Sequence, residues 1–209
     1  FSSNLKKELW YDEAMTLETY ASRGVWAALT DYRTTNNHIV FNCLLIPLTN
    51  LVPNNGDTAV LRLLPWACAL ISVGLLFAAV NRWKGPHAAV WASALLGASH
   101  TMQNYSCQLR GYSMSCMFAS LSLLLGLNML EAPTRRRCLA YALSVFFWLG
   151  VIPTNVVPLS ALTLWLILEL YKIRRHEAIA PRAKEALLVL ISAPILGMSW
   201  YFLQSLTRK

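Results

Sequence analysis

The chain has 209 residues, of which 56% are hydrophobic and only 13% carry a charge. No acidic residue occurs between Asp57 and Glu131, and only three basic residues interrupt positions 63–130. A soluble domain needs charged surface along its whole length, so this pattern excludes one and predicts an all-α polytopic membrane protein. The net charge of +8 does not indicate nucleic acid, because most basic residues lie in short gaps between apolar runs.

The first 38 residues carry nine charges and therefore cannot cross a bilayer, where one charge at a helix centre costs about 2.5–3.5 kcal/mol. Residues 12–23 predict a helix that Gly24 ends, with Asp12 at its N-cap or in its first turn. A second short helix is expected at 38–51, flat on the outer surface, because Pro47 interrupts it. Four aromatic residues are expected to hold the first helix at the membrane interface, namely Trp10, Tyr11, Tyr20 and Trp26.

Six apolar runs follow that are long enough to predict spanning helices. They cover about residues 63–81, 87–104, 112–130, 138–154, 156–171 and 186–203. The gaps after the first, third and fifth runs hold ten of the 18 Lys and Arg residues, whereas the other two gaps hold only Arg110. Because basic gaps stay in the cytoplasm, residues 1–60, Arg110 and residues 154–155 are expected on the extracytoplasmic side.

This topology predicts two parts of the chain. Residues 1–62 are expected to form an outer loop with juxtamembrane helices, and residues 63–209 a bundle of about six transmembrane helices in the cell (inner) membrane. Because the chain starts outside and begins with Phe1, a further span is expected before it, and the chain is interpreted as a fragment of a longer protein.

Three polar clusters are expected on the extracytoplasmic side. They are Asp12-Glu13, Asn36-Asn37-His38, and the turn with Gln108, Arg110 and Tyr112. Each has a plain structural explanation. Asp12 could cap its helix, where the dipole stabilises a carboxylate, and Arg110 could anchor a helix end to lipid phosphates. His38 alone would more often be a capping or interfacial residue.

Taken together, the three clusters predict transfer from a lipid phosphate. A carboxylate on the outer side can take a proton from an acceptor hydroxyl, and the planar fork of an arginine matches phosphate oxygens. Adjacent carboxylates on a helix point about 100° apart. Asp12 and Glu13 are therefore expected to divide into one base and one orienting partner, and not to share a proton.

The order of four motifs resembles the GT-C glycosyltransferases, and within them the protein O-mannosyltransferase and lipid A aminoarabinose transferase group. The motifs are WYDEA from position 10, D-x-x-x-x-N-N-H from position 31, VLRLLP from position 60 and YSCQLRGYSM from position 105. None is specific by itself, but four in this order and on the predicted sides of the membrane are far more specific. The resemblance covers nearly the whole chain and implies a GT-C-like helix bundle.

The resemblance also implies roles in the first outer loop. Asp12 falls on the family's catalytic base, with Glu13 beside it in the catalytic pair. Asn37 and His38 fall in a stretch that lines the family's substrate site. Ile39 replaces the proline that usually follows the histidine, which leaves the substrate contacts of this stretch open.

In the later outer turn, the resemblance implies that Tyr105, Arg110 and Tyr112 bind substrate, with the arginine meeting the donor phosphate. Gln108 stands where the family often has an acidic residue. Arg62, in the VLRLLP motif, is a family landmark that we expect either to be structural or to face lipid headgroups.

These features predict an inverting membrane glycosyltransferase that uses a polyprenyl-phosphate sugar on the periplasmic or lumenal side. Asp12 would deprotonate the acceptor hydroxyl, and Arg110 would stabilise the phosphate as it leaves. The implied partners are the lipid-linked sugar, membrane lipids, and an acceptor that is a lipid, a protein or a glycan. No cofactor and no metal ligand set is indicated, and the use of a divalent cation is left open.

Two alternatives remain at the sequence level. One is a carrier or flippase of lipid-linked sugars in which the outer loop is a gate, and the other is a non-catalytic membrane subunit. A carrier should have ionisable residues within its spans, yet the first five runs have none near their middle and only Glu169 near the inner end of the fifth. This favours an enzyme whose site lies at the membrane surface.

Overall fold

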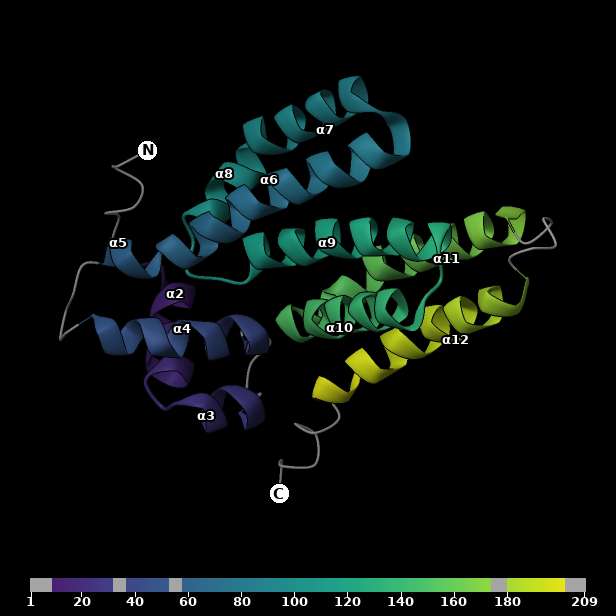
Figure 1. Cartoon of the computed structure of the whole chain (residues 1–209). Helices are drawn as coiled ribbons and strands as arrows, with labels where there is room; N and C mark the ends of the chain where they lie inside the picture. Colours follow the sequence, from purple (N-terminus) through teal and green to yellow (C-terminus); the bar gives the residue numbers. More distant parts are fainter. Residues whose placement is uncertain (1–8, 32–36, 53–57, 174–179, 202–209) are drawn as a thin grey trace.

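The computed structural model describes residues 9–31, 37–52, 58–173 and 180–201 (Figure 1). In these ranges all regular structure is helical and no strand occurs, which confirms the expected all-α class. The N-terminal part, which we call the outer segment after its predicted position, contains α2 (Tyr11–Met15), the π-helix η1 (Thr16–Ala21), α3 (Val25–Thr30), α4 (Ile39–Leu51) and α5 (Thr58–Leu61). The longer helices are α6 (Leu63–Lys84), α7 (Pro86–Ala98), α9 (Tyr112–Glu131), α10 (Arg135–Val151), α11 (Val156–Ile173) and α12 (Ala180–Gly197), with α8 (His100–Ser106) and the 3-10 turn η2 (Pro153–Asn155) between them.

The two short outer helices lie where the sequence predicts them. The first is made of α2 and η1, and Asp12 is in its first turn. It ends before Gly24, whose φ of 84° is a conformation that few other residues adopt. The second is α4, whose bounds differ from the prediction by one residue.

The aromatic residues of the first helix are only partly as expected. Trp10, Tyr11 and Trp26 are exposed over more than 70% of their surface and are free to contact an interface. Tyr20 is completely buried, so the expectation that it lies at the membrane interface is wrong. It faces inward because η1 packs against α3 and α4.

Within the described ranges, four stretches are long and apolar enough to cross a membrane. They are Thr58–Lys84, Tyr112–Glu131, Pro153–Lys172 and Ala183–Tyr201. They correspond to the first, third, fifth and sixth of the expected spans. The other two runs differ: α7 has 13 residues, and α10 has 17 and begins with three arginines.

The second apolar run is divided at Ser99. The backbone of Ser99 is extended, and its hydroxyl accepts a hydrogen bond from the Met102 N–H at 3.2 Å. This is a helix N-cap, and it starts α8 as a separate short helix. The expected continuous span over 87–104 is therefore two helices, α7 and α8.

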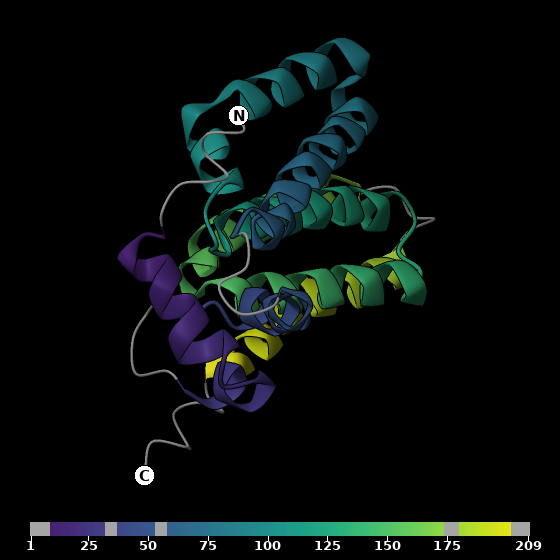
Figure 2. The same cartoon turned by 90° about the vertical axis from the view of Figure 1, so that its left-hand side faces the viewer.

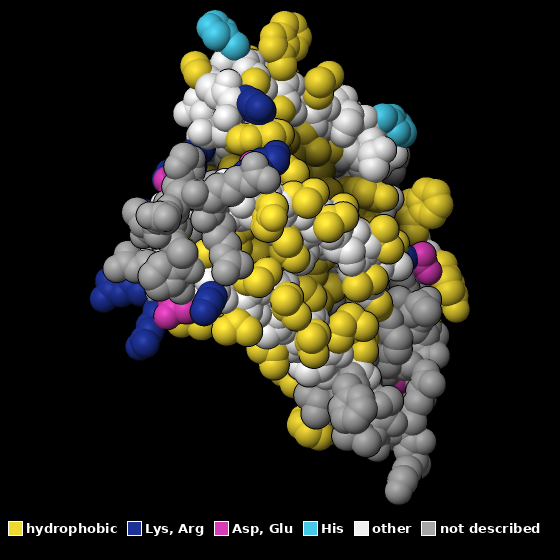
Figure 3. Space-filling model, turned by 90° about the vertical axis from the view of Figure 1, so that its right-hand side faces the viewer, with side chains coloured by type: hydrophobic (Ala, Val, Ile, Leu, Met, Phe, Trp, Pro, Cys, Tyr) yellow, Lys and Arg dark blue, Asp and Glu magenta, His cyan; other side chains and the backbone are white. Residues whose placement is uncertain are grey.

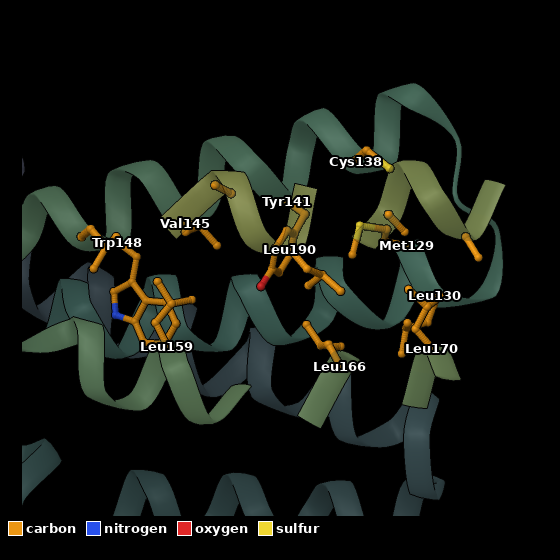
Figure 4. Packing of buried hydrophobic residues seen from close by; sticks show 14 residues of the cluster. Met129, Leu130, Cys138, Tyr141, Val145, Trp148, Leu159, Leu166, Leu170 and Leu190 are labelled. Carbon is orange, nitrogen blue, oxygen red and sulfur yellow. The ribbon is translucent and has the colours of Figure 1, made fainter. Parts of the chain in front are cut away.

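The long helices pack side by side, and four of them, α9 to α12, enclose one apolar core. Helix α6 contacts α7 and α9, α9 contacts α10, and α10 contacts α12, while α11 packs against α9 and α12. Figure 4 shows the buried side chains that α9, α10, α11 and α12 contribute to this core. Serine pairs add hydrogen bonds between helices, with oxygens 3.4 Å apart for Ser72 and Ser120 and 3.0 Å apart for Ser122 and Ser144. Such bonds are common between apolar helices.

A second apolar cluster holds the outer segment onto the bundle. Phe41 and Leu45 of α4 belong to the same buried cluster as Leu61, Leu109 and Val151. This cluster connects α4 to the start of α6, the turn before α9 and the end of α10. It holds η1, α3 and α4 beside the turn that carries Arg110.

The connections between the long helices lie at two opposite ends of the bundle. The last turns of α6, α9 and α11 and the first turns of α7, α10 and α12 lie at one end, whereas α2 to α5 and the start of α9 lie at the other (Figures 1 and 2). The first end carries the basic connections, and there Arg82 at the end of α6 pairs with Glu131 at the end of α9. The separation agrees with the topology that the positive charges predict.

Many large apolar side chains of the long helices point outward. Examples with more than half of their surface exposed are Leu70, Trp91, Leu139, Leu164 and Leu188. Hydrophobic side chains cover much of the face seen in Figure 3. An apolar exterior of this extent is typical of a surface that meets lipid or another protein.

Candidate functional site

Asp12 and Arg110 are 98 positions apart in the sequence and form a direct ion pair between Oδ2 and Nη1. Asp12 is in the first turn of α2, and Arg110 is in the turn between α8 and α9. The side chain of Asp12 is 55% exposed, whereas that of Arg110 is only 12% exposed. The two groups that the sequence predicts as base and phosphate partner therefore meet, with the carboxylate on the solvent side.

Aromatic rings support the guanidinium of Arg110. Its central carbon lies 5.0 Å from the ring centroid of Tyr112, which is cation–π contact. Tyr112 in turn stacks on Tyr105, with centroids 4.6 Å apart and an angle of 24° between the rings. The two tyrosines are thus in the predicted site, where Tyr112 packs against the guanidinium and Tyr105 packs against Tyr112.

Glu13 points away from this pair and is buried, with 2% of its surface exposed. Its Oε1 accepts a hydrogen bond from the Leu109 N–H at 2.7 Å. Its Oε2 accepts from Arg62 Nη2 and from the Trp10 N–H, both at 3.0 Å. With both oxygens engaged, Glu13 has no surface for a substrate, so this geometry gives it a positioning role and does not fit the expected catalytic one.

Arg62, just before α6, is the buried partner of that carboxylate, with 1% of its surface exposed. The expectation that it is structural agrees with this position, whereas an arginine facing lipid headgroups does not. The ion pair joins α2 to the start of α6, and the Leu109 bond joins α2 to the turn before α9. Removing one partner of such a pair would leave an uncompensated buried charge.

Asn37 is also buried, and all of its amide groups are used within the protein. Its Nδ2 donates to the carbonyl oxygens of Ala28 and Asp31, each at 2.8 Å, and its Oδ1 accepts from Asn42 Nδ2 at 2.9 Å. These bonds link α3 to α4. The expected role in substrate binding does not fit this arrangement, because no polar atom of the side chain is left to face a ligand. Asn36 lies outside the described residues.

His38, the N-cap residue of α4, lies directly against the Asp12–Arg110 pair. Its Nδ1 accepts a hydrogen bond from the Gly111 N–H at 2.7 Å, and its Nε2 lies 3.4 Å from Arg110 Nη2. The ring meets Tyr112 edge-on, with centroids 5.3 Å apart. Burial and, secondly, the charge of Arg110 lower the pKa of His38 to about 3, so the imidazole is neutral at physiological pH.

Two features of the site were not expected from the sequence, namely the Leu109 amide and the glycine at position 111. A Cβ on Gly111 would lie 2.9 Å from His38 Nδ1 and 2.7 Å from Val151 Cγ1. A glycine is therefore needed for the close approach of the turn to the histidine. The signal was present in the sequence as a glycine directly after the arginine of the fourth motif.

No group of three or more His, Cys, Asp or Glu side chains in the described part of the chain comes together in a way that could hold a metal ion. The polar groups of the site are instead one exposed carboxylate, one guanidinium and one neutral imidazole. A carboxylate can accept a proton, and the two nitrogen groups can bind an anion.

Comparison with known proteins found no matching family model, no matching curated protein and no matching solved structure. The resemblance to GT-C glycosyltransferases therefore rests on the order of the four motifs and on the predicted topology. The contacts of Asp12, Glu13, Arg62 and Arg110 are a separate observation.

Proposed function

We propose that the chain belongs to a membrane glycosyltransferase of the GT-C class that moves a sugar from a polyprenyl-phosphate donor to an acceptor hydroxyl. The reaction would take place on the extracytoplasmic side of the cell (inner) membrane. The observation that carries the proposal is the ion pair between Asp12 and Arg110, because it brings a base and a phosphate partner to one solvent-accessible position. The buried pair of Glu13 and Arg62 supports it, since it explains why α2 sits there.

A membrane position is supported by two further observations. Four described helical stretches are long and apolar enough to cross a membrane, and many apolar side chains on the long helices are exposed. The site lies at the end of the bundle opposite the basic connections (Figure 1). Under the positive-inside rule, that end is extracytoplasmic.

The proposed reaction is a direct displacement. The oxygen of the acceptor hydroxyl forms a bond to the anomeric carbon of the sugar, while the bond from that carbon to the phosphate oxygen breaks with inversion. The hydroxyl proton goes to Asp12. The lipid phosphate leaves with the bonding electrons, and Arg110 stabilises the charge that develops on it.

The ion pair also affects the order in which the donor binds and Asp12 becomes available to the acceptor. While Arg110 holds Asp12, the carboxylate is engaged and the guanidinium is partly neutralised. A donor phosphate that binds Arg110 competes with Asp12 for the same group. Donor binding would therefore release the carboxylate for the acceptor hydroxyl.

An apolar cavity of about 130 Å³ between α6, α7 and α8 is consistent with a lipid-linked donor. Its walls include Trp66, Leu70, Val73 and Met102, and Ser106 also lines it. Ser106 follows Tyr105, whose ring stacks on Tyr112 behind Arg110. Lipid close to the phosphate could lie against this part of the bundle.

The replacement Asp12→Asn tests the proposal. It keeps the size of the side chain but removes the base, so transfer of labelled sugar from a polyprenyl-phosphate donor should fall by about 10²–10⁴-fold. Glu18→Gln is the matched control, because Glu18 is an exposed acid on the same segment, and it should leave transfer unchanged. Near-normal transfer by Asp12→Asn would remove Asp12 from the mechanism, whereas a wild-type protein that transfers no sugar would favour a carrier.

A further inference from the structure

The hydrogen bonds of His38 define which of its nitrogens carries the proton. The Gly111 N–H points at Nδ1 at 2.7 Å, and a backbone N–H can only donate. Nδ1 must therefore be the acceptor. In a neutral imidazole the other nitrogen then carries the hydrogen, so Nε2 is a donor.

With this assignment, the contact between His38 Nε2 and Arg110 Nη2 is not a hydrogen bond. Both atoms are donors, and they lie 3.4 Å apart. The alternative, in which Nε2 accepts from the arginine, would place a proton on Nδ1 facing the Gly111 N–H at the much shorter distance of 2.7 Å. The shorter contact therefore determines the tautomer of His38. As a result, the N–H groups of His38 Nε2 and Arg110 Nη2 lie side by side.

Two converging donors need an acceptor. Two atoms 3.4 Å apart can both donate to one oxygen at ordinary hydrogen-bond lengths. Arg110 Nε is a further buried donor with no acceptor among the described residues. Oδ2 of Asp12 pairs with Nη1 of the guanidinium. The groups next to His38 therefore have an excess of donors over acceptors, which is the property of an anion site.

We infer that the Nε2–H of His38 and Nη2 of Arg110 together bind one oxygen of a phosphodiester, the group that links sugar and lipid in the donor. This inference rests on the proposed function for the identity of the phosphodiester. His38 is then a neutral donor to the phosphate, and neither a general base nor a cation. The backbone of Gly111 sets this role, because its N–H fixes the tautomer.

Two replacements of His38 test the roles of its two ring nitrogens separately. In His38→Asn, the amide oxygen can take the place of Nδ1 and accept from Gly111, but nothing replaces the Nε2–H. In His38→Gln, the amide nitrogen can take the place of the Nε2–H, but the acceptor for Gly111 is lost. The first variant isolates the phosphate contact and the second isolates the structural contact.

The measurement is binding of two probes to the full-length protein in detergent. Farnesyl methyl phosphate carries the phosphodiester with one constant negative charge, and farnesol is the same chain without it. The ratio of their dissociation constants is the phosphate preference. We expect His38→Asn to melt near the wild-type temperature and to lose about tenfold or more of the preference. His38→Gln should melt lower and keep the preference within about threefold.

The outcomes distinguish this inference from the proposed function. If the wild-type protein shows no phosphate preference, the proposed phosphate site itself is wrong. If the wild type prefers the phosphodiester and His38→Asn does so equally, the function stands and His38 is only structural. If His38→Asn does not fold, His38→Gln decides: a retained preference supports the inference, and a lost preference overturns it.

Discussion

At the scale of single residues, the neighbours Asp12 and Glu13 pair with different arginines and differ in exposure. Successive residues on a helix point about 100° apart, so one carboxylate reaches Arg110 at the surface and the other reaches Arg62 in the interior. The sequence predicted that the two carboxylates would not share a proton, which agrees with their separate partners; that one of them is a base stays a prediction. The partner of Glu13 was not predicted, because a buried arginine and a headgroup-facing arginine look the same in an apolar sequence.

His38 gives a prediction on pH and stability. The pKa of His38 in the folded protein, about 3, lies below the ordinary histidine value of 6.5 because the ring is buried and lies beside Arg110. The unfolded chain therefore takes up a proton below pH 6.5 that the folded chain does not take up until about pH 3. The contribution of His38 to the free energy of unfolding is therefore greatest above pH 6.5. It is lost as the pH falls from 6.5 towards 3, and the loss is about 2 kcal/mol at pH 5.

Thermal unfolding in detergent at pH 7 and pH 5 checks this expectation. The wild-type melting temperature should fall between the two, and the fall should be clearly smaller in His38→Asn, which cannot bind the proton. Because the carboxylates are the same in both proteins, their contribution cancels in the comparison. An equal fall in both proteins would show that His38 is not the group that titrates.

At the scale of elements, the turn between α8 and α9 is the part on which the site depends. It supplies Arg110, the Leu109 N–H that binds Glu13, and the Gly111 N–H that binds His38. Three consecutive residues thus contact α2 and the N-cap of α4. The sequence indicated the arginine, but the two backbone amides could not be found from side-chain patterns.

Gly111→Ala should therefore destabilise the protein. The added Cβ would lie 2.7 Å from Val151 and 2.9 Å from His38, and overpacking of this kind typically costs about 1–3 kcal/mol. Gly74→Ala is the control, since no other atom lies within 4 Å of its Cβ and alanine favours the helix. Thermal unfolding should show a lower melting temperature only for Gly111→Ala.

A second variant identifies the contact that causes this loss. Combining Gly111→Ala with Val151→Ala removes the closer of the two contacts and should restore part of the melting temperature. If Gly111→Ala melts like the wild type, the turn does not pack against α10 as described.

Other elements show where prediction from sequence was limited. Helix α4 was predicted to within one residue because His38, the apolar run and its polar end mark it clearly. The break at Ser99 was missed because the apolar run continues across it, although a serine after a glycine and an alanine is a possible N-cap. Tyr20 was misplaced because the residues that cover it come from α3 and α4, and one sequence does not show which elements meet.

At the scale of the whole molecule, the two ends of the bundle differ in charge and in chemistry. The basic connections lie at one end, and α2, α4 and the start of α9 lie at the other (Figure 1). These three elements position Asp12, His38 and Arg110. The count of basic residues predicted this separation before any contact was known. The positive-inside rule predicts such a separation for helices that insert into a membrane.

Labelling with a membrane-impermeant maleimide tests the proposed topology. In a protein whose native cysteines are all replaced, Glu18→Cys should react in intact cells, and Arg136→Cys should react only after the membrane is opened. Both positions are exposed in the structure, so access depends on the side of the membrane. Labelling of position 136 from outside would reverse the orientation and place the site in the cytoplasm.

In the proposed site, Arg110 binds the donor phosphate, whereas Asp12 competes with that phosphate for the guanidinium. The most direct measurement is binding of farnesyl methyl phosphate to Asp12→Asn and to Arg110→Ala in the full-length protein. Asp12→Asn should bind the probe at least as tightly as the wild type, because the carboxylate no longer competes for the guanidinium, whereas Arg110→Ala should bind about tenfold to a hundredfold more weakly. Equal affinity in all three proteins, or a similar loss in both variants, would contradict the account.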